Sequence, residues 1–234
     1  MKVLITSASS PFPQSLAGSL SGTHAVLLTD RQQMPSDLEF VRSDLDHSAA
    51  INDLVRGVDV IVHSGAVDPA DSVSDQLDYQ MRCTYNLLRA ATEEGVPRFI
   101  YLSSLLLMDG YDPELAVTER WKTLPTTDPP VLCYHLGEIV CREFAREGKI
   151  NVVILRLGDI TPESSPEPST SALCLDDAVD AVKKALTAEL SGSLDIFHIQ
   201  SAVPKARFLT GQPWWSADDV SPSFSLGYTP RQRS

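Results

Sequence analysis

The sequence predicts an α/β fold, with a doubly wound parallel sheet and helices on both of its faces. Two observations predict it. Short apolar runs typical of buried strands alternate with stretches that place apolar residues at helical spacing. Small or acidic residues follow most of these runs, as they do where parallel strands end at a ligand-binding edge. The 234 residues, 43% of them hydrophobic, suffice for one core, so we expect a single domain over residues 1–234.

The first thirty residues predict the unit around which the sheet is built. Lys2–Thr6 is a buried-strand candidate, Ser15–Leu20 a short helix, and His24–Asp30 a second strand that ends on a carboxylate. Strand, turn, helix, strand and acid in this order are the layout of a dinucleotide-binding, Rossmann-type unit. The turn departs from that layout, because residues 7–13 (SASSPFP) contain no glycine.

The remaining elements continue the alternation of strands and helices. Further strands are expected at Leu38–Val41, Val58–His63, Arg98–Leu102, Asn151–Leu157 and Leu194–Gln200. Helices are expected at Ser48–Val55, Ser74–Glu94, Tyr134–Arg146 and Asp176–Ala188. Residues 109–130 hold several prolines and are expected to be irregular.

Composition excludes several classes of partner. A formal charge of −12 and a pI near 4.7 argue against nucleic acid and anionic membranes. The four cysteines show no metal-type spacing, so we expect no metal site and reduced thiols in a cytoplasmic protein: Cys83, Cys133, Cys141 and Cys174. A strand candidate that begins at residue 2 leaves no room for a signal peptide, and no apolar run is long enough to span a bilayer.

Several motifs follow one another in a fixed order over most of the chain. They are residues 1–6, Asp44-Leu45, His63–Ala66, residues 83–91 (CTYNLLRAA), Arg98–Ser104, Tyr134–Glu138 and Val153–Gly158. In order and spacing they resemble the extended short-chain dehydrogenases/reductases, the NAD-dependent epimerase/dehydratase family. The family's substrate region is longer, so residues 159–172 and 204–234 are expected to form only a reduced cap on the substrate side.

The resemblance implies that NAD or NADP binds at the strand ends. The implied positions are Ser7, Ser10, Asp30, Arg31, Asp44, Leu45, Gly65 and Ala66. The charge of Asp30 favours NAD over a cofactor with a 2′-phosphate, whereas its neighbour Arg31 leaves NADP open. The glycine-free turn also leaves two interpretations open. It is either a reshaped phosphate-binding turn of low affinity or a plain connection that binds no ligand.

The resemblance also implies a catalytic pair. Tyr134 takes the position of the family's general acid/base, and Ser104 that of the hydroxyl that polarises the reacting oxygen. Where the family has a lysine, this chain has Glu138. A carboxylate one helical turn from a phenol is expected to raise the phenol pKa, at about 1.4 kcal/mol per unit. If the cofactor binds, restored turnover in Glu138→Lys would show that the missing cation is the defect.

Two functional hypotheses follow. The preferred one is a catalytically impaired relative, a pseudoenzyme with at most weak dinucleotide binding and a binding, regulatory or dimer-partner role. The alternative is an active NAD(P)-dependent oxidoreductase or nucleotide-sugar epimerase/dehydratase that uses Tyr134 and Ser104 without the lysine. In either case the resemblance implies a homodimer through the helices around Asn86 and Glu138.

Overall fold

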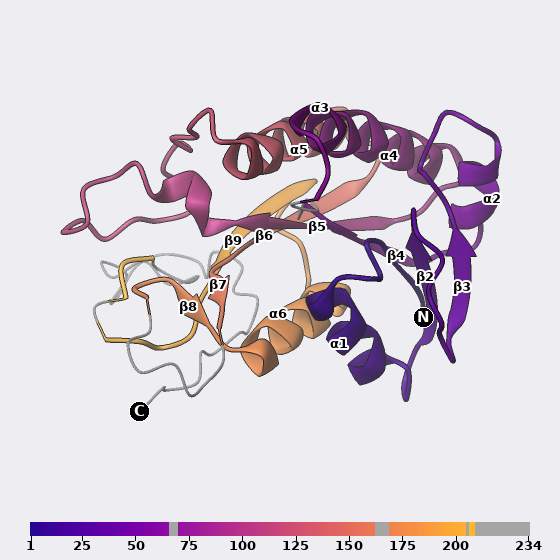
Figure 1. Ribbon diagram of the computed structural model, residues 1–234, viewed down its shortest axis with the longest axis horizontal. Helices are drawn as coiled ribbons and strands as arrows, with labels where there is room; N and C mark the ends of the chain where they lie inside the picture. Colours follow the sequence, from indigo (N-terminus) through magenta and orange to yellow (C-terminus); the bar gives the residue numbers. More distant parts are fainter. Residues whose placement is uncertain (66–69, 162–168, 205, 209–234) are drawn as a thin grey trace.

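A seven-stranded parallel sheet forms the centre of the molecule, in the strand order β3-β2-β1-β4-β5-β6-β9 (Figure 1). The computed structural model describes residues 1–65, 70–161, 169–204 and 206–208. The strands are β1 (Lys2–Ile5), β2 (Ala25–Asp30), β3 (Glu39–Arg42), β4 (Val60–Ser64), β5 (Arg98–Ser104), β6 (Asn151–Leu157) and β9 (Leu194–Ile199). The chain order reverses between β1 and β4, which is the switch point where ligands bind in such sheets.

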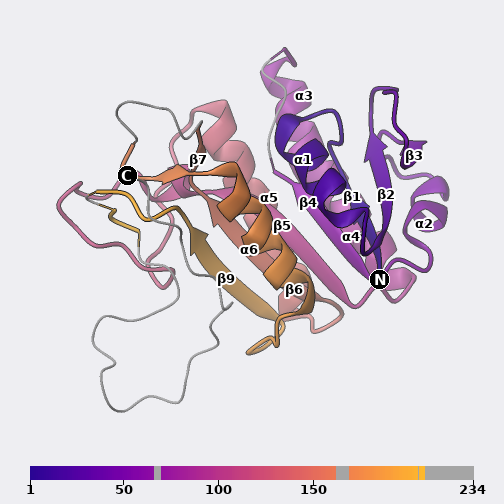
Figure 2. The ribbon, with the colours of Figure 1, turned by 90° about the horizontal axis from the view of Figure 1, so that it is seen from below.

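Helices cover both faces of the sheet (Figures 1 and 2). One face carries α1 (Pro11–Leu20) and α6 (Leu175–Thr187). The other carries α2 (Ala50–Val55), α3 (Val73–Asp78), α4 (Thr84–Glu93) and α5 (Pro129–Arg146). The doubly wound α/β fold that the sequence predicts is therefore confirmed.

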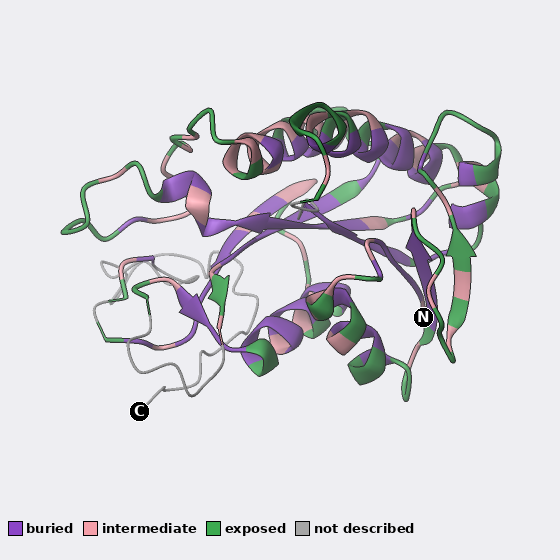
Figure 3. Ribbon diagram, in the orientation of Figure 1, coloured by how far each residue is buried: buried purple, intermediate pink, exposed green. Residues whose placement is uncertain are grey.

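The sheet separates two hydrophobic cores, because successive residues of a strand point to opposite faces. Val3 and Ile5 of β1 pack into the core under α1 and α6. Leu4, between them, packs into the core under α2, α4 and α5. The strands are accordingly buried along most of their length except for edge strand β3, which is mostly exposed, as are the outer helix faces (Figure 3).

Several helix boundaries differ from the sequence predictions, most of them by one or two residues. The long helix expected at Ser74–Glu94 is interrupted by a π-helical turn, η1 (Tyr79–Cys83), which separates α3 from α4. Helices α1 and α5 begin earlier than expected, at Pro11 and Pro129, because the first turn of a helix needs no intrahelical N–H donor. A short 3₁₀ helix, η2 (Leu105–Met108), follows β5 directly.

The expected cap is described only in part. The short strands β7 (Asp159–Ile160) and β8 (Ala172–Leu173) pair in parallel. Residues 162–168, 205 and 209–234 lie outside the described residues, and with them most of the cap that the sequence predicts. All four cysteines are buried free thiols. In the described part of the chain, no helix has both the length and the hydrophobicity needed to cross a bilayer.

Candidate active site

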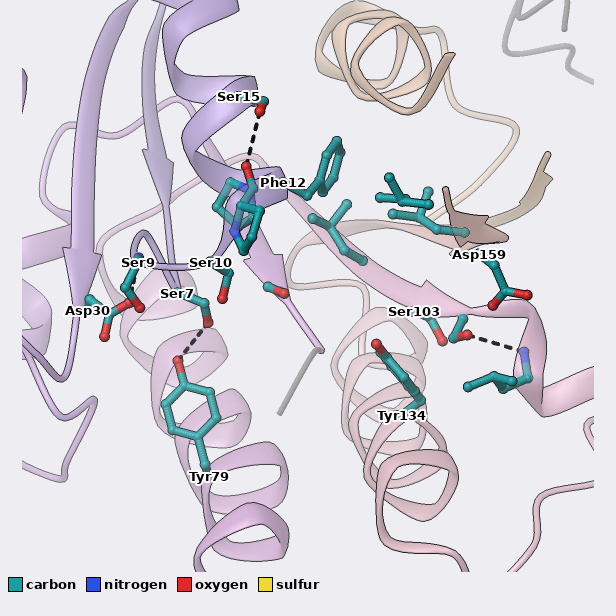
Figure 4. A pocket seen from close by; sticks show the side chains of 18 of the residues that line it. Ser7, Ser9, Ser10, Phe12, Ser15, Asp30, Tyr79, Ser103, Tyr134 and Asp159 are labelled. Atoms are coloured by element: carbon teal, nitrogen blue, oxygen red, sulfur yellow. Dashed lines mark hydrogen bonds between the residues drawn. The ribbon is translucent and has the colours of Figure 1, made fainter. Parts of the chain in front are cut away.

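A cavity of about 890 Å³ opens at the carboxyl ends of the strands. Its wall includes the β1–α1 turn, the end of β2, the start of η1, the end of β5, helix α5 and strand β7. The lining residues that the sequence predicts as functional are Ser7, Ser10, Asp30, Arg31, Ser104 and Tyr134. Figure 4 shows Ser7, Ser9, Asp30 and Tyr79 at one end, the nucleotide end, and Ser103, Tyr134 and Asp159 at the other, the reaction end.

The turn after β1 keeps a glycine-like shape without glycine. Ser7 has a φ of 52°, in the left-handed region that side chains other than glycine rarely adopt. Its hydroxyl lies 3.3 Å from the hydroxyl of Tyr79, which comes from the π-helical turn. This hydrogen bond helps to offset the conformational cost, so η1 supports the turn from outside it.

Most of the backbone amides of this turn already have acceptors. Ala8 donates to the Thr29 carbonyl, Ser9 to Asp30 Oδ2 at 2.9 Å, and Ser10 to the Ser7 carbonyl. Pro11 has no N–H to donate. A phosphate group at this turn therefore meets fewer free amides than a glycine-rich turn would offer, although the hydroxyls of Ser9 and Ser10 line the cavity.

The end of β2 supplies both a carboxylate and a cation. Asp30 accepts from the amides of Ser9 and Gln32, which fix its carboxylate at the cavity wall. Arg31 forms an ion pair with Asp71, a residue of the segment before α3. The Arg31 guanidinium also lies 4.9 Å from the ring centroid of Tyr79.

Three other predicted cofactor residues do not line the cavity. The carbonyls of Asp44 and Leu45 accept hydrogen bonds from Cys83 and Asn86, so this pair ties the loop after β3 to η1 and α4. Gly65 packs closely, since a Cβ there would lie 2.5 Å from the Tyr101 hydroxyl. Ala66 lies outside the described residues.

The two serines at the end of β5 differ in what their hydroxyls do. Ser103 donates to Glu138 Oε1 at 2.8 Å, in a buried contact. Ser104 instead accepts the Leu106 amide at 3.2 Å as the N-cap of η2, which leaves its own proton available for a ligand. Of the two, Ser104 is the better donor to a substrate oxygen.

Tyr134 reaches the same end of the cavity from the first half of α5. Burial raises the pKa of its phenol to about 12, with smaller contributions from Cys133 and Asp159. The raised pKa of Tyr134 agrees with the sequence expectation, but burial, and not Glu138, is its main cause.

Glu138 does not act on the cavity as the sequence analysis expects. It is 1% exposed, and its carboxylate is held by the Arg156 guanidinium through two hydrogen bonds of 2.8 Å. Burial alone would raise the pKa of Glu138, but Arg156, with help from Ser103 and Arg142, holds it below its ordinary value. Its charge is therefore neutralised inside the protein. A lysine at position 138 would face buried Arg156, so we expect Glu138→Lys to destabilise the fold.

Some cavity residues escaped the sequence analysis. Tyr79 and Asp71 lie in or near a helix whose π-helical turn no periodicity signals, so neither was singled out. Asp159 was recognisable as a strand-end acid, and it accepts the Ser169 and Ser171 hydroxyls at 3.1 Å each. Within the described ranges no group of His, Cys, Asp and Glu is arranged to hold a metal ion.

Known proteins resemble the chain over nearly its whole length. The model of the NAD dependent epimerase/dehydratase family matches residues 15–195. A uronate dehydrogenase of Pseudomonas putida is 26% identical over 245 residues, covering 100% of this chain and 85% of the relative. A uronate dehydrogenase of Agrobacterium fabrum is 29% identical over 160 residues, 66% of this chain and 58% of that relative.

Solved structures share the fold. Uronate dehydrogenase from Agrobacterium tumefaciens matches with a TM-score of 0.82 at 22% identity, over 99% of this chain and 84% of that one. UDP-N-acetylglucosamine 4-epimerase from Bacillus cereus matches with a TM-score of 0.70 at 20% identity, over 86% and 78% of the two chains. The family match spans most of the described strands and helices, and the chain therefore belongs to the NAD-dependent epimerase/dehydratase family of extended short-chain dehydrogenases/reductases.

Proposed function

We propose that this chain is an NAD-dependent oxidoreductase that acts on a hydroxyl or carbonyl group of a small polyhydroxylated substrate. One observation carries the proposal. Ser104 and Tyr134 both line a cavity that also includes the β1–α1 turn and Asp30, and Tyr134 lies at the end opposite Asp30 (Figure 4). The relatives that align over the whole chain and bear the name uronate dehydrogenase support the same reaction class.

The nucleotide end fits a dinucleotide at its adenosine side. The carboxylate of Asp30 is positioned to accept hydrogen bonds from ribose hydroxyls, as the acid after the second strand does in such units. The hydroxyls of Ser9 and Ser10 replace part of what glycine-rich turns supply through backbone amides. When bound, a nicotinamide cofactor supplies the hydride donor or acceptor.

The reaction end handles the substrate oxygen and its proton. Ser104 donates to that oxygen, because its hydroxyl proton has no acceptor among the residues that the structure describes. Tyr134 exchanges a proton with the substrate at its phenol oxygen. In this proposal Tyr134 works without a lysine, as Arg31 at the far end is the one cation among the described cavity residues.

A second candidate function is ligand binding without turnover. Two observations favour it: the pKa of Tyr134 is raised to about 12, and most amides of the β1–α1 turn are already used. A phenol with that pKa is almost entirely protonated at neutral pH, so little phenolate is available to act as the base. This candidate predicts cofactor binding with no oxidation of any substrate.

The two functions separate in a two-step experiment. The first step is a thermal-shift titration with NAD, NADH, NADP and NADPH, in which binding to the native state raises the melting temperature. The second measures NADH formation with uronates and neutral aldoses. Cofactor binding with turnover supports the oxidoreductase. Binding without turnover supports the second candidate, and no shift at millimolar cofactor contradicts both.

A further inference from the structure

An ion pair lies at the nucleotide end of the cavity. Arg31 follows β2, and Asp71 lies between β4 and α3. Since β1 lies between β2 and β4 in the sheet, the pair passes over the carboxyl end of β1. Both residues line the cavity, and their side chains are only 31% and 23% exposed.

The guanidinium of Arg31 is also held from a third side. It lies 4.9 Å from the ring centroid of Tyr79, within the range of a cation–π contact. Tyr79 is itself fixed, since it is 9% exposed and its hydroxyl lies 3.3 Å from that of Ser7. Arg31 is thus committed to protein partners.

The charges at this end are unevenly matched. Two carboxylates, Asp30 and Asp71, face one guanidinium, Arg31. A ribose with a free 2′-hydroxyl adds no charge and can donate to Asp30. A ribose with a 2′-phosphate adds about two negative charges next to both acids, while the cation that would neutralise them is engaged.

We infer that Asp71 is a positioning residue that makes the cavity prefer NAD to NADP, by holding Arg31 away from the ribose 2′ position. The inference rests on the proposed function, because it requires a dinucleotide with its adenosine ribose at Asp30. It assigns the choice between NAD and NADP to Asp71, which is far in sequence from Asp30, the acid at the end of the second strand that normally indicates this choice. Without Asp71, Arg31 is free to pair with a 2′-phosphate.

The test is the substitution Asp71→Asn, which removes the charge and keeps the size of the side chain. The dissociation constants of NAD and NADP are measured by calorimetry for both proteins at one ionic strength. We expect the ratio of the NADP constant to the NAD constant to fall by about tenfold, with the NAD constant changed by no more than about twofold. Asp71→Ser serves the same purpose if the asparagine variant melts early.

Two controls test whether the change in cofactor preference comes from the release of Arg31. Asp78→Asn removes one charge from α3, where Asp78 pairs with Arg82 away from the cavity, and the ratio is expected to stay unchanged. In the double variant Asp71→Asn/Arg31→Gln the gain in NADP affinity is expected to disappear, because Arg31 carries it.

The outcomes distinguish this inference from the proposed function. If NAD binds but the ratio is the same in the wild type and Asp71→Asn, the inference fails and the proposed function stands. An equal fall of the ratio in Asp78→Asn assigns the effect to net charge and also overturns the inference. If the wild type binds neither cofactor, both fail together.

Discussion

Tyr134 decides between the two candidate functions at the scale of a single residue. Burial raises the pKa of its phenol to about 12, so only about 10⁻⁵ of it is ionised at pH 7. If it removes the proton during alcohol oxidation, the ionised fraction and the rate rise about tenfold per pH unit below that pKa.

The first prediction concerns this pH dependence. We expect kcat for oxidation to rise steadily from pH 7 to 10 in the wild type, measured as initial rates of NADH formation. In Tyr134→Phe we expect kcat to fall by about 10²-fold or more and its rise with pH to disappear. A wild-type profile that Tyr134→Phe reproduces would remove Tyr134 from the chemistry.

We expect Glu138 to contribute to stability rather than to the reaction. The second prediction is that Glu138→Gln lowers the free energy of unfolding by about 3 kcal/mol, because it leaves Arg156 buried with no opposite charge. The measurement is urea unfolding at pH 7. Glu143→Gln is the matched control on the same helix, since Glu143 pairs with Arg146 in solvent and little change is expected.

The difference in unfolding free energy between wild type and Glu138→Gln depends on pH. Because Arg156 lowers the folded-state pKa of Glu138, its stabilisation is fully present above the ordinary value of 4.5 and is lost as the pH falls through the folded value. The gap in stability between wild type and Glu138→Gln is therefore expected to shrink on acidification below pH 4.5. A gap that stays constant down to the acid transition would contradict this account.

The sequence predicts several site residues through motifs that the fold brings together. Asp30 and Ser104 end strands β2 and β5, Tyr134 lies on α5, and all three line the cavity. The partner of Glu138 could not be predicted, because Arg156 lies on β6 and meets Glu138 only when α5 packs on the sheet.

At the scale of elements, α5 rests on β5 through a glycine. A Cβ on Gly137 would lie 2.0 Å from the hydroxyl of Tyr101 and 2.5 Å from its ring carbon Cζ. Tyr101 is fully buried and donates to Gln80 Oε1, so it has no room to move aside. The close approach of this helix to the sheet therefore requires glycine.

The third prediction tests that contact. Gly137→Ala is expected to lower the free energy of unfolding by about 2–3 kcal/mol through overpacking. Gly18→Ala is the control: Gly18 lies in α1 with nothing within 4 Å of an added Cβ, and alanine there is expected to stabilise by about 0.5–1 kcal/mol. Chemical denaturation of both variants measures the two changes. Equal effects of both substitutions would contradict the proposed role of Gly137.

The order and type of the main helices and strands can be predicted from the spacing of apolar residues. Local irregularities within these elements and in the turns between them cannot. The π-helical turn inside the predicted long helix adds a residue to one turn, which no hydrophobic pattern signals. The shape of the β1–α1 turn is equally hidden, since no pattern in the sequence signals the left-handed φ of Ser7 or its contact with Tyr79, which is distant in sequence.

At the scale of the whole molecule, the outer face of the helical layer is partly apolar. Met81, Tyr85 and Ile139 are 53%, 45% and 43% exposed on η1, α4 and α5. Helices α4 and α5 contact each other directly, so these side chains lie on one layer. We expect this face to pair with a second copy of the chain.

The fourth prediction follows from that face. Light scattering is expected to give about twice the monomer mass of 25.5 kDa for the wild type. Tyr85→Glu combined with Ile139→Glu is expected to give the monomer mass, because it places charges in the apolar contact. Val41→Glu, at a 40% exposed position on β3, is the control and should not change the mass. A monomeric wild type would contradict the homodimer.

The doubly wound architecture was predictable because strands buried on both faces form nearly continuous apolar runs. The extent of the cap was not, because its segments contain few apolar residues with a regular period. Of the cap, the structure adds the β7–β8 pair and the contact between Val117 and Phe208.

Tyr79 touches both Ser7, whose backbone gives the turn its shape, and Arg31, whose charge lies at the nucleotide end. The Tyr79 side chain thus contacts both the β1–α1 turn and the cation at the nucleotide end. Glycine at position 7 would remove the hydroxyl that pairs with Tyr79. The Tyr79 ring would then be held less firmly against the guanidinium of Arg31. Substitutions at these three sites should therefore be strongly non-additive.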